Sequence, residues 1–268
     1  MYVIDTHCHV YPDAIAEKAA GATDKFYQGH SCRDGKVRTL LEEDRKGGID
    51  YTVLCSVATT PHQVHSINRF IAGTVAAYPE RFSGFGALHP DSADPRGDVE
   101  EILSLKLKGV KLHPDIQGFA INDPHCRWMY ELCQEAQLPI LFHAGDPRYH
   151  FSNPEQLLPV LREFPQLTVI GAHFGAYQNW GPEVEKLYGM PNLYVDCSST
   201  MFAVTPQRFV EMVHGFGADR VFFGTDYPMW SPGEELQRFL TLPLTEEEQR
   251  LILCDNARRV LGVGGEAL

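Results

Sequence analysis

The chain has 268 residues, of which 44% are apolar and 22% charged, a composition typical of a globular protein. The net charge of −12, with no tract rich in lysine or arginine to offset it, argues against a nucleic-acid or anionic-membrane partner. No stretch reaches the roughly 18 apolar residues that a membrane span needs. The N-terminus has no signal region and the seven cysteines are scattered singly, so we expect a cytoplasmic protein.

Eight short segments have apolar residues on both faces, which is typical of buried parallel strands. In chain order they are Val3–Asp5, Tyr51–Val57, Phe82–Leu88, Gly109–Leu112, Ile140–Phe142, Thr168–Gly171, Leu193–Asp196 and Val221–Gly224. Helical patterns lie between them at Gln63–Ala77, Asp98–Leu107, Pro124–Ala136, Pro154–Phe164 and Pro206–Gly215. Thr245 and Glu248 have the spacing of a capping box, which predicts a last helix that ends near Gly262.

Strands that alternate with helices along the whole length predict an α/β protein. Eight of them predict a (β/α)8 TIM barrel, formed by a single domain over residues 1–268. An open doubly wound sheet is the alternative, but no strand is followed by a GxGxxG or Walker loop. The connection over residues 10–38 is unusually long, and it forms either a lid over the barrel mouth or a peripheral helical excursion.

His7 and His9 follow the first apolar run, almost at the start of the chain. Because side chains alternate along a strand, Asp5, His7 and His9 should point the same way. Both imidazoles then project into one space, where they could chelate a divalent metal. Cys8 would face away and act as a buried apolar filler. Asp5 would either orient a ligand histidine or cap a neighbouring backbone group.

The C-terminal ends of the strands, where the chemistry of a (β/α)8 barrel lies, carry polar residues at nearly every position. These residues are Asp5, His7, His9, His89, Lys111, His113, His143, His173, Asp196 and Asp226. Such groups are costly to bury unless they are paired or bound to metal. Their placement at one rim therefore indicates a shared purpose.

We predict a metal ion held by His7, His9, His143 and Asp226. Imidazoles with a carboxylate suit Zn²⁺, and Mn²⁺, Fe²⁺ or Co²⁺ are the other candidates. Asp226 is also the candidate general base for a metal-activated water. His173 is expected to shuttle a proton and stabilise developing charge, or to bind a second metal. The structural alternative for His173 is a core histidine bonded to a backbone carbonyl.

Three more residues are candidates for binding a small-molecule substrate. Lys111 could bind a carboxylate or phosphate, be carbamylated between two metals, or pair with Asp196 or Asp5. His113 shares a face with Lys111, but a proline follows it and it could serve only to shape the loop. Arg148 lies among aromatic residues, and its guanidinium suits a planar or carboxylated ligand.

Taken together, these motifs resemble the amidohydrolase superfamily, and more narrowly its amidohydrolase-related branch, which includes the aminocarboxymuconate-semialdehyde decarboxylase-like proteins. The matching segments are Ile4–His9, Gly109–Pro114, Phe142–Gly145, Gly171–Gly175, Phe223–Pro228 and Asn256–Gly262. The resemblance implies a (β/α)8 barrel with a divalent metal, usually zinc. It places the metal ligands at His7, His9, His143 and Asp226 and the catalytic histidine at His173.

Members of this superfamily hydrolyse amides or lactones, hydrate double bonds, or decarboxylate aromatic and muconate acids. We therefore expect a metal-dependent hydrolase of a C–N or C–O bond in a small, carboxylated molecule. The alternatives are a non-oxidative decarboxylase of an aromatic or muconate-type acid and an inactive metal-binding scaffold. A nuclease of the superfamily is disfavoured because the chain lacks a basic track. The sequence leaves open whether the chain forms a homodimer.

Overall fold

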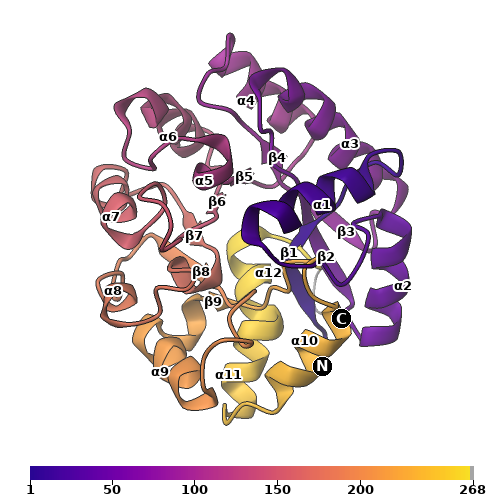
Figure 1. The fold of residues 1–268 in the computed structure, drawn as a ribbon, viewed down its shortest axis with the longest axis vertical. Helices are drawn as coiled ribbons and strands as arrows, with labels where there is room; N and C mark the ends of the chain where they lie inside the picture. The colour runs from indigo at the N-terminus through magenta and orange to yellow at the C-terminus, as the bar shows by residue number, and fades with distance from the viewer. Residues whose placement is uncertain (266–268) are drawn as a thin grey trace.

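The computed structural model describes residues 1–265, which form a ring of parallel strands surrounded by helices (Figure 1). The strands are β1 (Ile4–His9), β2 (Tyr51–Cys55), β3 (Phe82–Gly84), β4 (Gly86–Ala87), β5 (Val110–Leu112), β6 (Ile140–Phe142), β7 (Val169–Gly171), β8 (Leu193–Asp196) and β9 (Val221–Phe222). They pair in chain order, β1-β2-β3 in one sheet and β4 to β9 in the other. No helix of the described residues has both the length and the apolar character needed to span a membrane.

The third predicted strand is split at Phe85 into β3 and β4, which together occupy one position of the barrel. The backbone N–H of Phe85 donates to the carbonyl of Leu54 in β2 at 2.8 Å. The next N–H, that of Gly86, donates to Gly109 just before β5, also at 2.8 Å. The segment therefore exchanges one neighbouring strand for the other at this point, and the nine strands fill eight positions.

The ring closes where the segment after β9 runs along β1. The N–H of Thr6 donates to the carbonyl of Phe223 at 2.9 Å, and that of Asp226 to His7 at 2.8 Å. The N–H of His9 donates to Tyr227 at 2.6 Å. These bonds remove the free edges of the first and last strands, and the predicted (β/α)8 barrel is confirmed.

The longer helices are α1 (Ala16–Tyr27), α2 (Val37–Gly47), α3 (Val64–Ala77), α4 (Pro95–Ser104), α6 (Arg127–Glu135), α7 (Pro154–Glu163), α9 (Pro206–Phe216) and α10 (Pro232–Leu240). Short helices are α5 (Pro114–Gln117), α8 (Pro182–Glu185), α11 (Glu246–Arg250) and α12 (Asn256–Leu261). The capping box at Thr245 is present, and α12 ends at Gly262 in a left-handed conformation. The helix predicted there is not continuous, because a π-helical turn separates α11 from α12.

Apolar side chains fill the barrel interior below the rim. Val53, Leu141, Ile170 and Phe222 belong to one buried cluster, which also includes residues of α12. Lys111 pairs in register with Leu141, and Leu141 pairs with Ile170. Residues in register on parallel strands face the same side, so Lys111 points into the barrel.

Candidate metal centre

An irregularity in β1 sets the positions of His7 and His9. The pairing with β2 shifts between Asp5 and Cys8, which is a β-bulge. Asp5 therefore turns away from the histidines, and its carboxylate accepts hydrogen bonds from the N–H groups of His7 and Thr225 at 3.1 and 3.0 Å. It caps the backbone, the second of its two expected roles. Burial raises the pKa of Asp5 to about 6.

The two histidines still converge, as the alternation predicts. Their Nε2 atoms lie 3.1 Å apart. Cys8 between them is fully buried, and its thiol donates to Asp5 at 3.1 Å. Asp226, from the closing segment, places Oδ1 3.5 Å from His7 Nε2 and 3.6 Å from His9 Nε2. Donors from both ends of the chain thus face one point.

These three donor atoms fit a divalent ion. Two ligands bound at about 2.0–2.1 Å to one ion stand about 2.9–3.4 Å apart at octahedral to tetrahedral angles. The observed separations of 3.1–3.6 Å come close to that range. His7 also turns its Nδ1 toward the buried carboxylate of Asp196 at 2.9 Å. A carboxylate behind the histidine fixes the tautomer that leaves Nε2 free for metal.

Asp196 stays ionised in its buried position. Burial acts to raise its pKa, but His7 and the Ser198 hydroxyl more than offset this and hold the pKa below its ordinary value. Ser198 donates to Asp196 at 2.5 Å, and the N–H of His173 donates to the same carboxylate at 3.2 Å. One carboxylate therefore orients two of the predicted site histidines.

A hydrogen count around His143 and His173 also points to a cation. His143 Nε2 lies 3.0 Å from the carbonyl of Gly145, and His173 Nδ1 lies 3.0 Å from that of Ser198. A carbonyl only accepts, so each of these nitrogens carries the proton. The other two nitrogens, His143 Nδ1 and His173 Nε2, then face each other as lone pairs at 3.1 Å.

Protonating one of the two rings would relieve this contact, but burial opposes it. Burial lowers the pKa of His143 well below its ordinary value and that of His173 to about 4. Burial therefore favours the neutral form of both rings, and a cation beside the two lone pairs would relieve their contact. The ring of His173 stacks on that of His7 at 5.5 Å, which places this pair next to the donors of β1.

His143 itself lies to one side of His7, His9 and Asp226. Its neighbours include His173, Tyr27 and His113, whose ring stacks on that of His143 at a centroid distance of 4.0 Å. Among the described residues, His143 has possible metal-binding atoms close to those of His113 and Asp115. The four-ligand set of His7, His9, His143 and Asp226 therefore stays a prediction.

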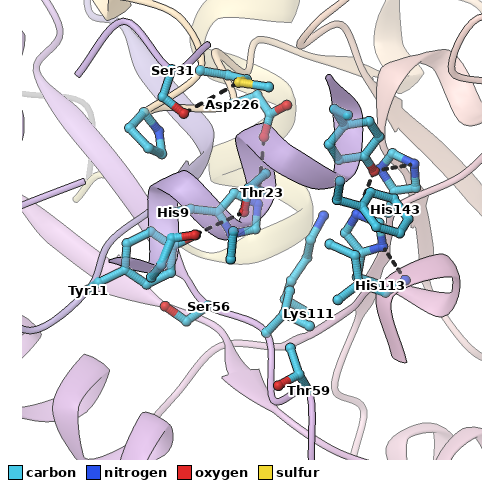
Figure 2. Close-up of a pocket in the computed structure, with 18 of the residues that line it drawn as sticks. His9, Tyr11, Thr23, Ser31, Ser56, Thr59, Lys111, His113, His143 and Asp226 are labelled. Atoms are coloured by element: carbon cyan, nitrogen blue, oxygen red, sulfur yellow. Dashed lines mark hydrogen bonds and ion pairs between the residues drawn. The ribbon is translucent and has the colours of Figure 1, made fainter. Parts of the chain in front are cut away.

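Lys111 rises from the barrel floor between these two groups (Figure 2). It is 1% exposed, and its Nζ lies 3.0 Å from His7 Nε2. Burial lowers the pKa of its amine. Its hydrogen-bond partner is His7, instead of the Asp196 or Asp5 carboxylate that we considered. A buried amine at this point can meet an anionic substrate group.

His113 both shapes its loop and lines the cavity. Its Nδ1 accepts the N–H of Ile116 at 3.3 Å and so caps α5. Its Nε2 lies 2.7 Å from the hydroxyl of Tyr27, the last residue of α1. Burial lowers the pKa of His113 well below its ordinary value. The imidazole is therefore neutral.

Arg148 lies outside the cavity lining of the described chain. Its guanidinium pairs with Asp146 at 2.7 Å, donates to the carbonyl of Phe26 at 2.6 Å and stacks on the rings of Phe26 and Tyr27. This geometry holds α1 in place. A substrate anchor would line the cavity with free N–H donors. Arg148 lies outside the lining, and its N–H groups already bond to Asp146 and Phe26.

The histidines, Lys111 and Asp226 line a cavity of about 630 Å³ at the C-terminal ends of the strands. Residues of α1 form one wall of this cavity. Residues 10–38 therefore form a lid over the barrel mouth and not a peripheral helical excursion. Tyr27 lines the cavity as part of this lid. Ser199, whose hydroxyl donates to Asp226 Oδ2 at 2.6 Å, was missed by the sequence analysis. Ser199 stands three positions after Asp196, and that proximity was the available signal.

The sequence profile of the family described as Amidohydrolase matches residues 4–263. The chain belongs to the amidohydrolase family. This amidohydrolase is 24% identical to a 2-amino-3-carboxymuconate-6-semialdehyde decarboxylase of Dictyostelium discoideum, with 97% of this chain and 84% of the relative covered.

Two solved structures share the fold of this amidohydrolase. An uncharacterised TIM-barrel protein of Bordetella bronchiseptica has a TM-score of 0.82 at 24% identity, covering 98% of this chain and 99% of the other. A dihydroxybenzoic acid decarboxylase of Polaromonas, bound to manganese and the inhibitor 2-nitroresorcinol, has a TM-score of 0.76 at 18% identity, covering 99% and 98%.

Proposed function

We propose that this amidohydrolase is a metal-dependent, non-oxidative decarboxylase of an aromatic or muconate-type hydroxy acid. The observation that carries the proposal is the set of His7, His9 and Asp226 donors beside a buried amine, Lys111, in a chain similar to a decarboxylase over 97% of its length. The sequence alone predicts a hydrolase, with a decarboxylase as the alternative. The named relative and the dihydroxybenzoic acid decarboxylase favour the alternative.

His7, His9, His143 and Asp226 are the proposed ligands of a divalent ion. Nitrogen and carboxylate donors suit Zn²⁺ and also Mn²⁺, the metal bound in the Polaromonas enzyme. Bound there, the ion would supply positive charge for a carboxylate and a neighbouring hydroxyl oxygen of the substrate. The lone pairs of His143 and His173 face each other at 3.1 Å, which supports a cation at this end of the cavity.

The residues of the chain would assist the loss of CO2 in separate ways. Lys111 would bind the substrate carboxylate, and the apolar walls would keep water from it. The bond between the ring carbon and the carboxylate carbon breaks, and its electron pair stays on the ring carbon. That carbon then takes a proton, so CO2 leaves and no water is consumed. Asp226 is the proposed proton donor, after it has taken up the proton of the substrate hydroxyl, and His173 is the second candidate.

Carbon dioxide release from 2-hydroxybenzoate and dihydroxybenzoates, assayed with added Mn²⁺ or Zn²⁺, tests the proposal. In D2O, we expect deuterium at the ring carbon that loses the carboxylate. Asp226→Asn should abolish release, while the exposed control Asp219→Asn should retain it. If ¹⁸O from labelled water enters products of lactones or amides and no aromatic acid loses CO2, hydrolysis is the activity and the proposal is wrong.

A further inference from the structure

The cavity has two unlike halves. Its floor carries the histidines, Asp226 and Lys111, whereas its outer half lies between α1 and α3. Apolar side chains line these walls: Ile15 just before α1, Ala19, Ala22 and Phe26 on α1, and Ile67 and Phe70 on α3. The polar side chains of Lys18, Thr23 and Ser66 stand beside them. The spacing of four, three and four residues along α1 puts its apolar side chains on one face of the helix.

This apolar face is only partly covered by protein, which includes Arg148 and Tyr149 on the Phe26 ring. Ile15 is 49% exposed, Ala22 is exposed, and Phe26, Ile67 and Phe70 are only partly buried. The buried residues of α1 are Ala16 and Ala20, which lie on a different side of the helix. An amphipathic helix usually turns its apolar stripe to the core. Here the stripe faces the cavity, so the cavity is where it can be covered.

The charges of the cavity limit what can cover it. Among the described lining residues, the lysine and arginine side chains are Lys111 at the floor and the exposed Lys18 on α1. One buried cation matches one substrate carboxylate. At about 630 Å³, the cavity lies in the range that holds drug-sized ligands, so a single-ring acid would leave most of it to water.

We infer that the substrate is a hydroxyarene monocarboxylate with an apolar substituent, which occupies the chamber between α1 and α3 while the carboxylate reaches Lys111. The inference rests on the proposed function for the acid end of the substrate. The substituent is separate from the reacting carbon, and its burial would contribute affinity in proportion to the apolar area removed from water.

Equilibrium binding of two probes, salicylate and 4-phenylsalicylate, tests the inference by calorimetry on the protein as purified. We expect the phenyl compound to bind about tenfold or more tightly than salicylate. Ala22→Phe, which fills the outer chamber from an exposed position on α1, should remove this preference. Lys25→Phe adds a ring to the same helix at an exposed position outside the lining, and should preserve it.

The outcomes separate this inference from the proposed function. Equal affinity for the two probes, or a preference that persists in Ala22→Phe, would overturn the chamber as a substrate site. If the preference is present and is lost in Ala22→Phe, but neither probe releases CO2, then the chamber stands and the proposed decarboxylation of such acids is wrong. Thermal unfolding of both variants checks that α1 is still folded.

An independent observation concerns the hydroxyl of Tyr27. It lies 2.7 Å from His113 Nε2 and 3.1 Å from His143 Nε2. Both nitrogens carry protons, because His113 Nδ1 accepts from Ile116 and His143 Nε2 faces the carbonyl of Gly145. The Tyr27 oxygen therefore accepts from His113 and at most shares the His143 N–H with the Gly145 carbonyl, and its own proton has no acceptor among the described residues.

The geometry assigns Tyr27 as a hydrogen-bond donor to a carboxylate or hydroxyl oxygen of the substrate. Tyr27→Phe should weaken salicylate binding about tenfold, as expected for loss of a bond to a charged group. It should leave the ratio between phenylsalicylate and salicylate unchanged. Tyr149→Phe, outside the cavity lining, is the matched control. Unchanged salicylate affinity in Tyr27→Phe, in a variant with normal unfolding, would overturn the assignment.

Discussion

Three residues of the candidate site hold a left-handed backbone conformation: His173, Ser199 and Asp226, with φ of 58°, 45° and 62°. Residues other than glycine seldom adopt it, and strain of this kind gathers at functional sites. Local bonds compensate for it, since the N–H of Asp226 donates to His7 and that of His173 to Asp196. The strained backbone aims these side chains into the cavity.

Metal content should depend on the Asp226 carboxylate. Asp226→Asn replaces a charged ligand by a neutral amide of the same shape, so we expect the divalent ion to be lost or bound at least about tenfold more weakly. Elemental analysis of the purified variant, together with titration by Mn²⁺ and Zn²⁺, measures this. Asp219→Asn is the surface control, and full occupancy in both proteins would contradict the ligand assignment.

Asp44 in α2 makes stability depend on pH. It is fully buried, and burial raises its pKa from 3.8 to about 8, although Thr52 donates to it at 2.8 Å. The folded protein therefore holds this proton over a pH range in which the unfolded chain has released it. The favourable contribution is complete below about pH 4 and is lost as the pH rises toward about 8.

We expect Asp44→Asn, which keeps an acceptor for Thr52 but cannot ionise, to become more stable than the unmodified protein as the pH rises. The gain should begin above about pH 4 and level off above about pH 8, at up to a few kcal/mol. Urea unfolding at several pH values measures it. A difference in stability that does not change with pH would contradict the assignment to Asp44.

At the scale of elements, α2 and α10 touch backbone to backbone through two glycines. A Cβ built on Gly47 would lie 2.5 Å from the Cα of Gly233, and one on Gly233 would lie 2.6 Å from that of Gly47. Backbone cannot move aside cheaply at such a contact. Glycine at these two positions therefore lets the helices on either side of the barrel closure pack together.

Gly233→Ala should destabilise the protein by about 1–3 kcal/mol, because the added methyl pushes α10 away from α2. Gly73→Ala in α3 is the matched substitution, since a Cβ at Gly73 meets nothing within 4 Å. It should stabilise by about 0.5–1 kcal/mol through helix propensity. Thermal unfolding of the two variants measures the change in stability. Equal changes would show that the contact between Gly47 and Gly233 does not determine the effect.

Strands and helices were predicted to different extents. Ile140–Phe142 and Leu193–Asp196 were predicted with their observed bounds, because short apolar runs between turns mark buried strands. The helices α2 and α10 were missed. The N-cap of α2 has no side-chain hydrogen bond, so its start has no capping signal, although Val37, Leu40 and Leu41 pack on the core. Tertiary packing, which no local pattern records, completes both helices.

Prediction of the candidate site from the sequence is limited in the same way, because local patterns do not record tertiary contacts. Strand-end positions predicted His7, His9, Lys111, His113, His173 and Asp226 correctly as neighbours in one cavity. The left-handed residues, the bulge in β1 and the lone-pair contact of His143 depend on atoms far apart in the sequence. Arg148 shows the same dependence, since its type suits a ligand, and its pairing with Asp146 and Phe26 is visible only in the fold.

At the scale of the whole molecule, the proposed metal ligands come from opposite ends of the barrel seam. An ion bound to β1 and to the segment after β9 binds only the folded barrel, so it stabilises that state by about 2.7 kcal/mol at a concentration of 100 Kd. Addition of EDTA should lower Tm by about 5–10 °C. The Tm of Asp226→Asn should not change on addition of EDTA. An equal fall in Tm in both proteins would contradict a role for Asp226 in metal binding.

The seam between Thr6 and Phe223 joins residues 217 positions apart in the sequence. A ribosome synthesises His7 and His9 first and Asp226 only near the end, so for most of translation the nascent chain has two imidazoles without their carboxylate. At the proposed site, high-affinity metal capture would therefore wait until Asp226 has emerged and the seam with β1 has closed. Metal occupancy would then distinguish fully assembled molecules from prematurely terminated ones.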